Sequence, residues 1–283
     1  MGIKKRIKKR IKQILKSLSF KYIYNEFKQE IIFETIDLVK IQSTDYTLNS
    51  IEYCISNNER GVYMRFGDGD VFLLNNISDS SQTANEFLAT EMLEAFRVND
   101  VNVFKSLAIH SNLFGFEEGM FDGNHKNTDS LSLNLLQSTY MYFIGQKIYS
   151  PVALHFIASQ NPKRANTFLK TLKLKTKMFI GNQDISSSTI KMLFGNVKCI
   201  KTPSLNAYNE IDRIYTESIE EIKRFDDFGV VVIAMGCSGR PLMKRLFNNS
   251  AQSFFLFDFG SLIDGFEGVN SREWLSVNNI NYK

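Results

Sequence analysis

Residues 229–235 read Gly-Val-Val-Val-Ile-Ala-Met and form the most apolar strand candidate of the chain. A strand with one face in water alternates apolar and polar residues, whereas a strand covered on both faces is apolar throughout. The segment therefore predicts a parallel strand buried between helices. The next four residues, 236–239, read Gly-Cys-Ser-Gly, and a helical pattern starts at Gly239. This order predicts a strand that turns sharply into a helix.

Strand candidates and helical patterns alternate along the rest of the chain. The other predicted strands are Gly61–Phe66, Val101–His110, Lys147–His155, Lys177–Ile180, Val197–Lys201 and Ser253–Phe257. The predicted helices are Thr47–Asn57, Thr83–Arg97, Leu131–Gly145, Lys163–Leu172, Ser186–Phe194, Ser204–Arg224 and Gly239–Phe247. Such alternation predicts an α/β fold, a Rossmann-like, mostly parallel sheet with helices on both faces. Residues 112–129 are rich in Gly, Asp and Asn and are expected to form a loop.

Composition is typical of one globular domain. The 283 residues are 43% hydrophobic and 23% charged, and no linker rich in Pro, Gly or Ser divides them. We expect a catalytic-type domain over residues 46–283, preceded by a basic, amphipathic helical extension over residues 1–45. The three cysteines and three histidines are spaced unlike a zinc site or a disulfide framework. A reducing, cytoplasmic setting is therefore expected.

The basic charge of the chain is concentrated at its N-terminus. Residues 1–21 contain nine Lys and Arg and no acidic residue, and Ile or Leu recurs every three to four positions. This pattern is typical of a helix lying on an anionic membrane surface, so peripheral attachment to the inner face of the cell membrane is expected. A solvated helix packed on the body and a nucleic-acid-binding arm are the alternatives. Without those nine, the 34 basic residues fall to 25, against 30 acidic ones, so no nucleic-acid partner is expected for the body.

Polar residues follow several predicted strands, where ligands of open parallel sheets bind. The clearest group is residues 64–70, Met-Arg-Phe-Gly-Asp-Gly-Asp. In an extended segment Asp68 and Asp70 would face the same side and suit Mn²⁺ or Mg²⁺ held with diphosphate oxygens. Gly67 would let the backbone approach a ligand, and Arg65 would pair with a phosphate or orient a carboxylate. The alternative is a plain Gly-Asp turn in which Asp70 caps a helix.

Three further segments predict a nucleotide pocket. Asn182 follows one strand, Ser204 is a candidate helix N-cap with Asn206 and Tyr208 close by, and the residue 236–239 turn offers Gly236 and Ser238. That turn lacks the glycine spacing of a dinucleotide site and the lysine of a P-loop. Ordinary turns and helix starts are the alternatives for all three segments.

Two acidic residues follow the last predicted strand. Asp258 or Asp264 would act as the general base that accepts a proton from an incoming acceptor hydroxyl. Asp264 is favoured because it lies between residues that predict an open, glycine-flanked loop. A capping or turn role is the alternative for both residues.

Together these segments resemble the GT-D glycosyltransferase family over roughly residues 50–268. The resemblance is carried by residues 65–70 (Arg-Phe-Gly-Asp-Gly-Asp), 154–156 (Leu-His-Phe), 202–208 (Thr-Pro-Ser-Leu-Asn-Ala-Tyr) and 258–261 (Asp-Phe-Gly-Ser). It implies a Rossmann-type domain that binds a UDP-sugar and a divalent metal through an Asp-x-Glu pair, here Asp68 and Asp70. The chain has Asp70 where the family has Glu, and Ser261 and Asp264 where the family has His and an acidic run.

The resemblance implies transfer of a sugar from a nucleoside-diphosphate donor to a glycan or lipid-linked saccharide acceptor. Assembly of bacterial surface glycans or glycoproteins is the expected setting. Two other classes stay open at this point. One is a different nucleotide-dependent transferase, such as a methyltransferase that uses the turn at residues 236–239, and the other is a non-catalytic, membrane-attached, nucleotide-binding module.

Overall fold

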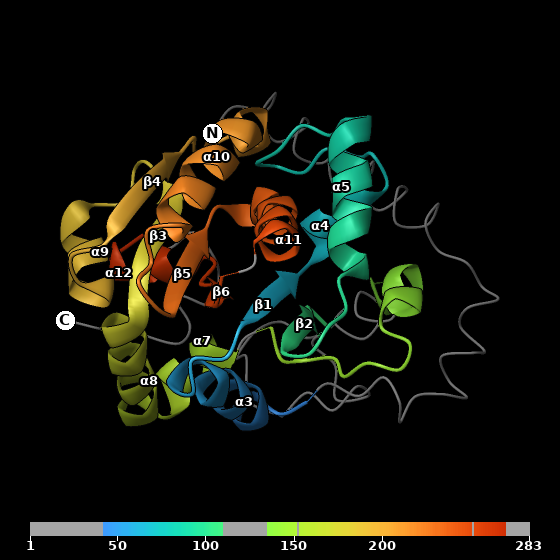
Figure 1. Cartoon of the computed structure of the whole chain (residues 1–283). Helices are drawn as coiled ribbons and strands as arrows, with labels where there is room; N and C mark the ends of the chain where they lie inside the picture. Colours follow the sequence, from blue (N-terminus) through green and yellow to red (C-terminus); the bar gives the residue numbers. More distant parts are fainter. Residues whose placement is uncertain (1–41, 110–134, 152, 251, 270–283) are drawn as a thin grey trace, which may run out of the picture.

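Six parallel strands form one sheet in the order β2-β1-β6-β5-β3-β4 (Figure 1). The computed structural model describes residues 42–109, 135–151, 153–250 and 252–269. The strands are β1 Gly61–Phe66, β2 Val103–Leu107, β3 Thr176–Asn182, β4 Lys198–Thr202, β5 Gly229–Ala234 and β6 Phe254–Asp258. The predicted Rossmann-like sheet is confirmed.

Helices cover both faces of the sheet and give it two apolar cores. The α-helices are α3 Thr44–Ser56, α4 Asp68–Leu74, α5 Glu86–Arg97, α7 Ala153–Gln160, α8 Pro162–Lys175, α9 Ser187–Phe194, α10 Ile211–Ile222, α11 Gly239–Asn249 and α12 Leu262–Phe266. Short 3₁₀ helices are η4 Tyr140–Tyr142, η5 Ala207–Glu210 and η6 Gly236–Ser238. Strand residues alternate between the cores: Val231 and Ile233 pack with α4, α5, α10 and α11, whereas Val230 and Val232 pack with α3, α7, α8, α9 and α12.

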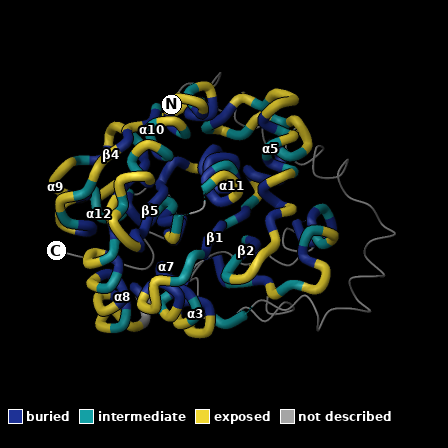
Figure 2. Tube along the Cα trace, in the orientation of Figure 1, coloured by how far each residue is buried: buried dark blue, intermediate teal, exposed yellow. Residues whose placement is uncertain are grey.

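Strand β5 lies inside the sheet and all six of its residues are buried, as its sequence predicted (Figure 2). The edges of the sheet are protected in different ways. At β2, the backbone N–H of Tyr149 donates to the carbonyl of Lys105 at 2.9 Å and covers the edge. At β4, the exposed side chains of Lys198 and Lys201 discourage pairing with another strand.

In the part of the chain that the structure describes, no helix is both long and apolar enough to cross a bilayer. The predicted basic helix within residues 1–21 and the predicted loop 112–129 lie outside the described residues.

One predicted strand is wrong. Among the described residues, segment Lys147–His155 joins no ladder of the sheet; it makes an isolated parallel bridge between Tyr149 and Ser106, and helix α7 starts at Ala153. Pro151 lacks the N–H that a continuing ladder needs. The apolar residues beyond it are buried as a helix instead, and a short apolar run does not distinguish the two by its periodicity.

Two helix predictions also need correction. The segment Ser204–Arg224 is not one helix, because Asn206 adopts the left-handed conformation (φ 55°) and helical structure starts only with η5. A helix from Thr83 would place Phe87 on its apolar side with Leu88, but Phe87 is 81% exposed. Asn85 caps this helix by accepting from the N–H of Leu88, so α5 starts later than predicted and Phe87 lies in its first turn.

Candidate functional site

The structure brings the predicted polar segments to one edge of the sheet. Asp68 follows the end of β1, Asn182 and Asp258 end β3 and β6, and Ser204 and Gly236 follow β4 and β5. All six strands are parallel, so their carboxyl ends lie along the same edge. This carboxyl edge is the candidate site.

Asp68 and Asp70 do not lie in an extended segment, contrary to the prediction. They occupy the first turn of helix α4, where residues two positions apart point about 200° away from each other. Asp68 is exposed, and its Oδ1 accepts from the N–H of Gly69 at 2.9 Å. Asp70 is buried, and its Oδ2 accepts from the N–H of Gly67 at 2.8 Å, which closes the start of the helix. The two carboxylates therefore have separate environments.

An arginine whose side chain is only 11% exposed joins two of the predicted site residues. Arg240 Nε lies 3.3 Å from Asp70 Oδ1, and Arg240 Nη1 lies 3.1 Å from Asp258 Oδ2. Nη1 also donates to the carbonyl of Gly236 at 2.7 Å. Burial raises the pKa of Asp70 to about 6, against the opposing effects of Arg240 and the Gly67 hydrogen bond. This Arg240 cluster ties the ends of β1, β5 and β6 together below the surface of the site.

Arg65 connects the end of β1 to two loops. Its backbone N–H donates to Asp258 Oδ2 at 3.3 Å, its Nε donates to the carbonyl of Pro151 at 2.6 Å, and its Nη1 donates to the carbonyl of Phe259 at 3.5 Å. The guanidinium passes directly over Gly260, which has a φ of 58°. A Cβ atom at Gly260 would lie 1.8 Å from Arg65 Nη1. Arg65 thus holds the loop after β6 in place.

Replacement of Gly260 by alanine is expected to destabilise the fold by about 2–3 kcal/mol. A left-handed backbone costs an L-residue about 1–2 kcal/mol, and the displaced Arg65 loses its carbonyl partners. Gly268→Ala is the matched control, because Gly268 also has a positive φ (73°) but no atom within 4 Å of the added Cβ. Denaturant unfolding of both variants separates the cost of the left-handed backbone from the cost of displacing Arg65. Equal losses of unfolding free energy in the two variants would show that displacement of Arg65 costs nothing.

The loop of residues 75–85, between α4 and α5, contacts the segments that follow β4 and β5 and was not predicted as part of the site. We call it the Gln82 loop. Oε1 of the buried Gln82 accepts from Ser238 Oγ at 2.9 Å and from the backbone N–H of Tyr208 at 3.1 Å. Asn206 Oδ1 accepts from the N–H of Thr83 at 2.8 Å. These bonds bring three predicted site residues, Asn206, Tyr208 and Ser238, against one loop. The loop is polar and without periodicity, so only its position after the first site segment could have drawn attention to it.

Other predicted residues have defined partners in the structure. The hydroxyl of Tyr208 donates to Glu91 Oε2 at 2.9 Å, so it points toward α5. Ser204 is not a helix N-cap. Its Oγ donates to Asn182 Oδ1 at 3.0 Å and also bonds to Asp184, which places these three polar side chains together at the β3–β4 end of the carboxyl edge.

Gly69 is enclosed by two side chains near Asp68. A Cβ atom at Gly69 would lie 2.9 Å from Cys237 Sγ and 3.2 Å from the carboxyl carbon of Asp79. Burial, followed by the charge of Asp70, raises the pKa of the Cys237 thiol well above its ordinary value. The thiol is therefore held in its protonated form, which is the less nucleophilic form of cysteine. Asp79 is an acidic residue of the site that the sequence analysis did not identify.

The residues near the end of β6 differ in access. Asp258 is buried in the Arg240 cluster, whereas Asp264 is half-buried on α12 rather than in the predicted open loop. His155, on α7, is buried, and burial together with the charge of Arg65 lowers its pKa well below the ordinary value. The imidazole is therefore neutral at physiological pH. Of the two predicted bases, Asp264 is the more accessible.

The described residues offer few metal ligands. No group of three or more His, Cys, Asp or Glu side chains among them is arranged to hold a metal ion. Asp70 is engaged by Arg240, whereas the carboxylate of Asp68 is exposed. Mg²⁺ is usually bound by one or two protein carboxylates with water and substrate phosphates, so Asp68 alone fits one position of such a shell.

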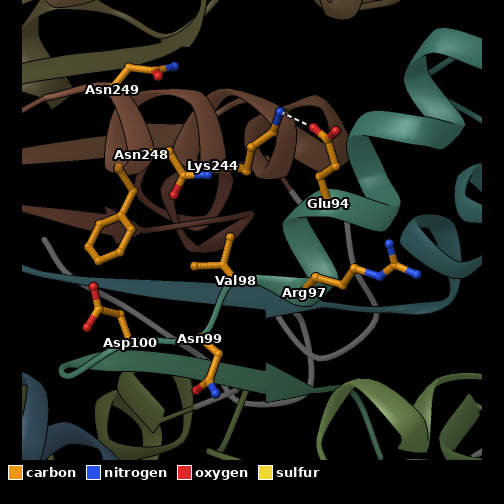
Figure 3. A pocket seen from close by; sticks show the side chains of 9 residues that line it. Glu94, Arg97, Val98, Asn99, Asp100, Lys244, Asn248 and Asn249 are labelled. Atoms are coloured by element: carbon orange, nitrogen blue, oxygen red, sulfur yellow. Dashed lines mark hydrogen bonds and ion pairs between the residues drawn. The ribbon is translucent and has the colours of Figure 1, made fainter.

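A pocket of about 540 Å³ lies away from this edge (Figure 3). It is formed where α5 and α11 end, next to the segment that leads into β2. Its lining residues are Glu94, Arg97, Val98, Asn99, Asp100, Lys244, Phe247, Asn248 and Asn249. Both helices end near the amino ends of the strands, so this pocket is not part of the candidate site.

Comparisons with known proteins agree with this architecture. The family model described as "Glycosyltransferase GT-D fold" matches residues 63–272. One similar solved structure is described as a highly conserved domain of unknown function 1792 with a distinct glycosyltransferase fold. It has a TM-score of 0.60 and 18% identity over 84% of each chain. Another is described as a new glycosyltransferase (DUF1792) from Streptococcus sanguinis, with a TM-score of 0.58 and 18% identity over 81% of this chain and 84% of that one. No curated protein matches the chain.

Proposed function

Since this chain belongs to the GT-D family of glycosyltransferases, we propose that it transfers a sugar from a nucleoside diphosphate, UDP above all, to a saccharide acceptor. The observation that carries the proposal is the exposed carboxylate of Asp68, which directly follows β1. Strand β1 is an interior strand of the sheet, between β2 and β6. The carboxylate lies at the edge where open parallel sheets bind ligands, above the buried Arg240 cluster. The acceptor is a glycan or a lipid-linked saccharide of a bacterial surface.

Asp68 is the residue that we propose as a ligand of Mn²⁺ or Mg²⁺. A bound divalent cation supplies positive charge that stabilises the departing diphosphate. Asp70, the second half of the predicted pair, has a different role in this proposal. Through its hydrogen bond to Gly67 and its ion pair with Arg240, it holds the first turn of α4 so that Asp68 faces the donor.

The nucleotide is proposed to bind toward the β3–β4 end of the edge. Asn182, Ser204 and Asp184 supply a polar cluster there, and the Gln82 loop fixes the neighbouring backbone around Asn206 and Ser238. Hydroxyl and amide groups of this kind suit a ribose and a base. Asp264 is proposed as the base that accepts the proton of the acceptor hydroxyl, because Asp258 is occupied by Arg240.

A ligand screen tests the proposed function. The melting temperature of the protein is measured with UDP, UDP-sugars, other nucleoside diphosphates and S-adenosylmethionine, each with and without Mn²⁺. Nucleoside diphosphates and their sugars should raise it, and S-adenosylmethionine should not. Release of UDP from the preferred sugar donor should then accompany transfer to an added saccharide. Stabilisation by S-adenosylmethionine alone, or UDP binding with no turnover of any UDP-sugar, would contradict the assignment.

A further inference from the structure

Helices α3 and α8 lie side by side on the outside of one helical layer (Figure 1). Four contacts fix them along their length, one of them from the hydroxyl of Thr171 to Glu52 Oε1 at 3.3 Å. Arg164 Nη2 lies 2.6 Å from Glu52 Oε2 and donates to Asn49 Oδ1 at 2.7 Å, and Lys175 Nζ donates to Asn58 Oδ1 at 2.9 Å. The helices therefore run parallel and present one joint surface, which we call the α3–α8 face.

The α8 half of this face is basic. The helix sequence contains five basic residues and no acidic one. Its apolar side is buried against the core by Ala165, Phe168, Leu169 and Leu172. Lys163, Lys170 and Lys173 are exposed, and no ion pair to them occurs within the described parts of the chain. Lys173 also donates to the carbonyl of Met192 at 2.9 Å, in the last turn of α9. The exposed side of α8 is thus positively charged, and no acidic side chain among the described residues pairs with these three lysines.

Exposed aromatic and apolar side chains also occur on these two helices. On α3, Tyr46 and Tyr53 are 41% and 62% exposed and lie seven residues apart, on the same side of the helix. Leu174, near the end of α8, is 83% exposed. Lys147 Nζ lies 4.6 Å from the centre of the Tyr46 ring and adds another positive charge. Tyrosine and lysine together are typical of surfaces that contact lipid headgroups. An acidic protein as the binding partner would need only the lysines, so the tyrosines favour a membrane.

The sequence that precedes α3 also favours an anionic membrane as the partner. Helix α3 directly follows the N-terminal 41 residues, and residues 1–21 contain nine basic residues and no acidic one. This basic segment thus precedes α3 by about 20 residues in the sequence. We propose that the α3–α8 face lies on an anionic phospholipid bilayer, with Lys163, Lys170 and Lys173 at the headgroups and Tyr53 and Leu174 in the interface.

This contact has a consequence for the carboxyl edge. Helix α3 ends shortly before β1 begins and α8 ends where β3 begins, so both helices start toward the carboxyl ends of the strands. A bilayer along the two helices would border the candidate site. An acceptor anchored in that bilayer could then reach Asp68 without leaving the membrane.

Vesicle sedimentation of the full chain tests the proposal. Binding is expected to vesicles that contain phosphatidylglycerol and not to pure phosphatidylcholine. The triple variant Lys163→Gln, Lys170→Gln, Lys173→Gln should bind about a hundredfold more weakly, since each lysine at an anionic surface contributes roughly fivefold. The matched control is Lys198→Gln, Lys201→Gln, Lys223→Gln, exposed lysines on β4 and after α10, whose loss should change binding less than about threefold because they lie outside the α3–α8 face.

A second measurement locates the contact. An environment-sensitive dye is attached through Tyr53→Cys or, as a control, through Glu217→Cys on α10, each in a Cys199→Ser background. Anionic vesicles should shift the emission of the dye at position 53 to the blue and leave that at position 217 unchanged. Three results would overturn the proposal: no vesicle binding, binding with a silent dye at position 53, or equal loss of binding in the two triple variants. Tight binding to RNA or heparin without any dye shift would identify a soluble polyanion as the partner instead.

Discussion

Asp68→Asn should reduce sugar transfer about a hundredfold or more while leaving the fold intact. The substitution keeps the shape of the side chain and the Oδ1 atom that accepts from the N–H of Gly69. It removes the negative charge that we propose as a ligand of the divalent cation bound to the diphosphate. Loss of such charge stabilisation costs several kcal/mol in the transition state. Initial rates at saturating Mn²⁺, combined with UDP affinity from calorimetry, measure the effect.

The unfolding free energy should separate this effect from a structural one. Asp68 is exposed, so its substitution should change stability by no more than about 0.5 kcal/mol. Asp227→Asn is the control, because Asp227 is 75% exposed and lies before β5, at the opposite edge of the sheet. Wild-type rates in the Asp68→Asn protein would remove Asp68 from the mechanism and leave Asp79 as the carboxylate to test.

Arg240→Met should destabilise the protein by about 3–5 kcal/mol. The methionine fills much of the space of the arginine stem, but Asp70 and Asp258 are left buried without their positive partner. Removal of one partner from a buried ion pair is strongly destabilising for this reason. Equilibrium urea unfolding at pH 7 provides the measurement.

Two further observations isolate the electrostatic cause. The triple variant Arg240→Met, Asp70→Asn, Asp258→Asn removes all three charges and should recover at least half of the lost stability. The single Arg240→Met variant should also become relatively more stable as pH falls from 7 to 5, since burial already raises the pKa of Asp70 and a raised pKa favours the protonated native state at lower pH. A loss that neither change reduces would be due to packing.

Most of the fold could be predicted from local sequence. The wholly apolar strand β5 and the alternation of strands and helices indicated a parallel sheet with two covered faces. Helix α4 was not predicted because its first turn contains Asp68, Gly69 and Asp70, residue types that disfavour helix. The burial of Val71, Phe72 and Leu73, together with the Asp70 cap, outweighs that local preference.

The site was predictable in position but not in its pairings. Strand ends located Asp68, Asn182, Gly236 and Asp258 correctly at one edge. Nothing in the local sequence of Arg240 indicates that it contacts Asp70, which is far away along the chain. Contacts of this kind follow from the order of the strands in the sheet, which the sequence pattern alone did not supply.

The central pairing of β1 with β6 also determines when the site can exist during synthesis. Tyr63 is paired with Phe257, and Arg65 bonds to Asp258, so the first strand gains one of its two neighbours only from near the end of the chain. Contacts so distant in sequence form late and slow folding. During synthesis Asp68 is therefore present long before the strand that completes its surroundings, and a chain terminated before residue 258 is expected to lack the assembled carboxyl edge.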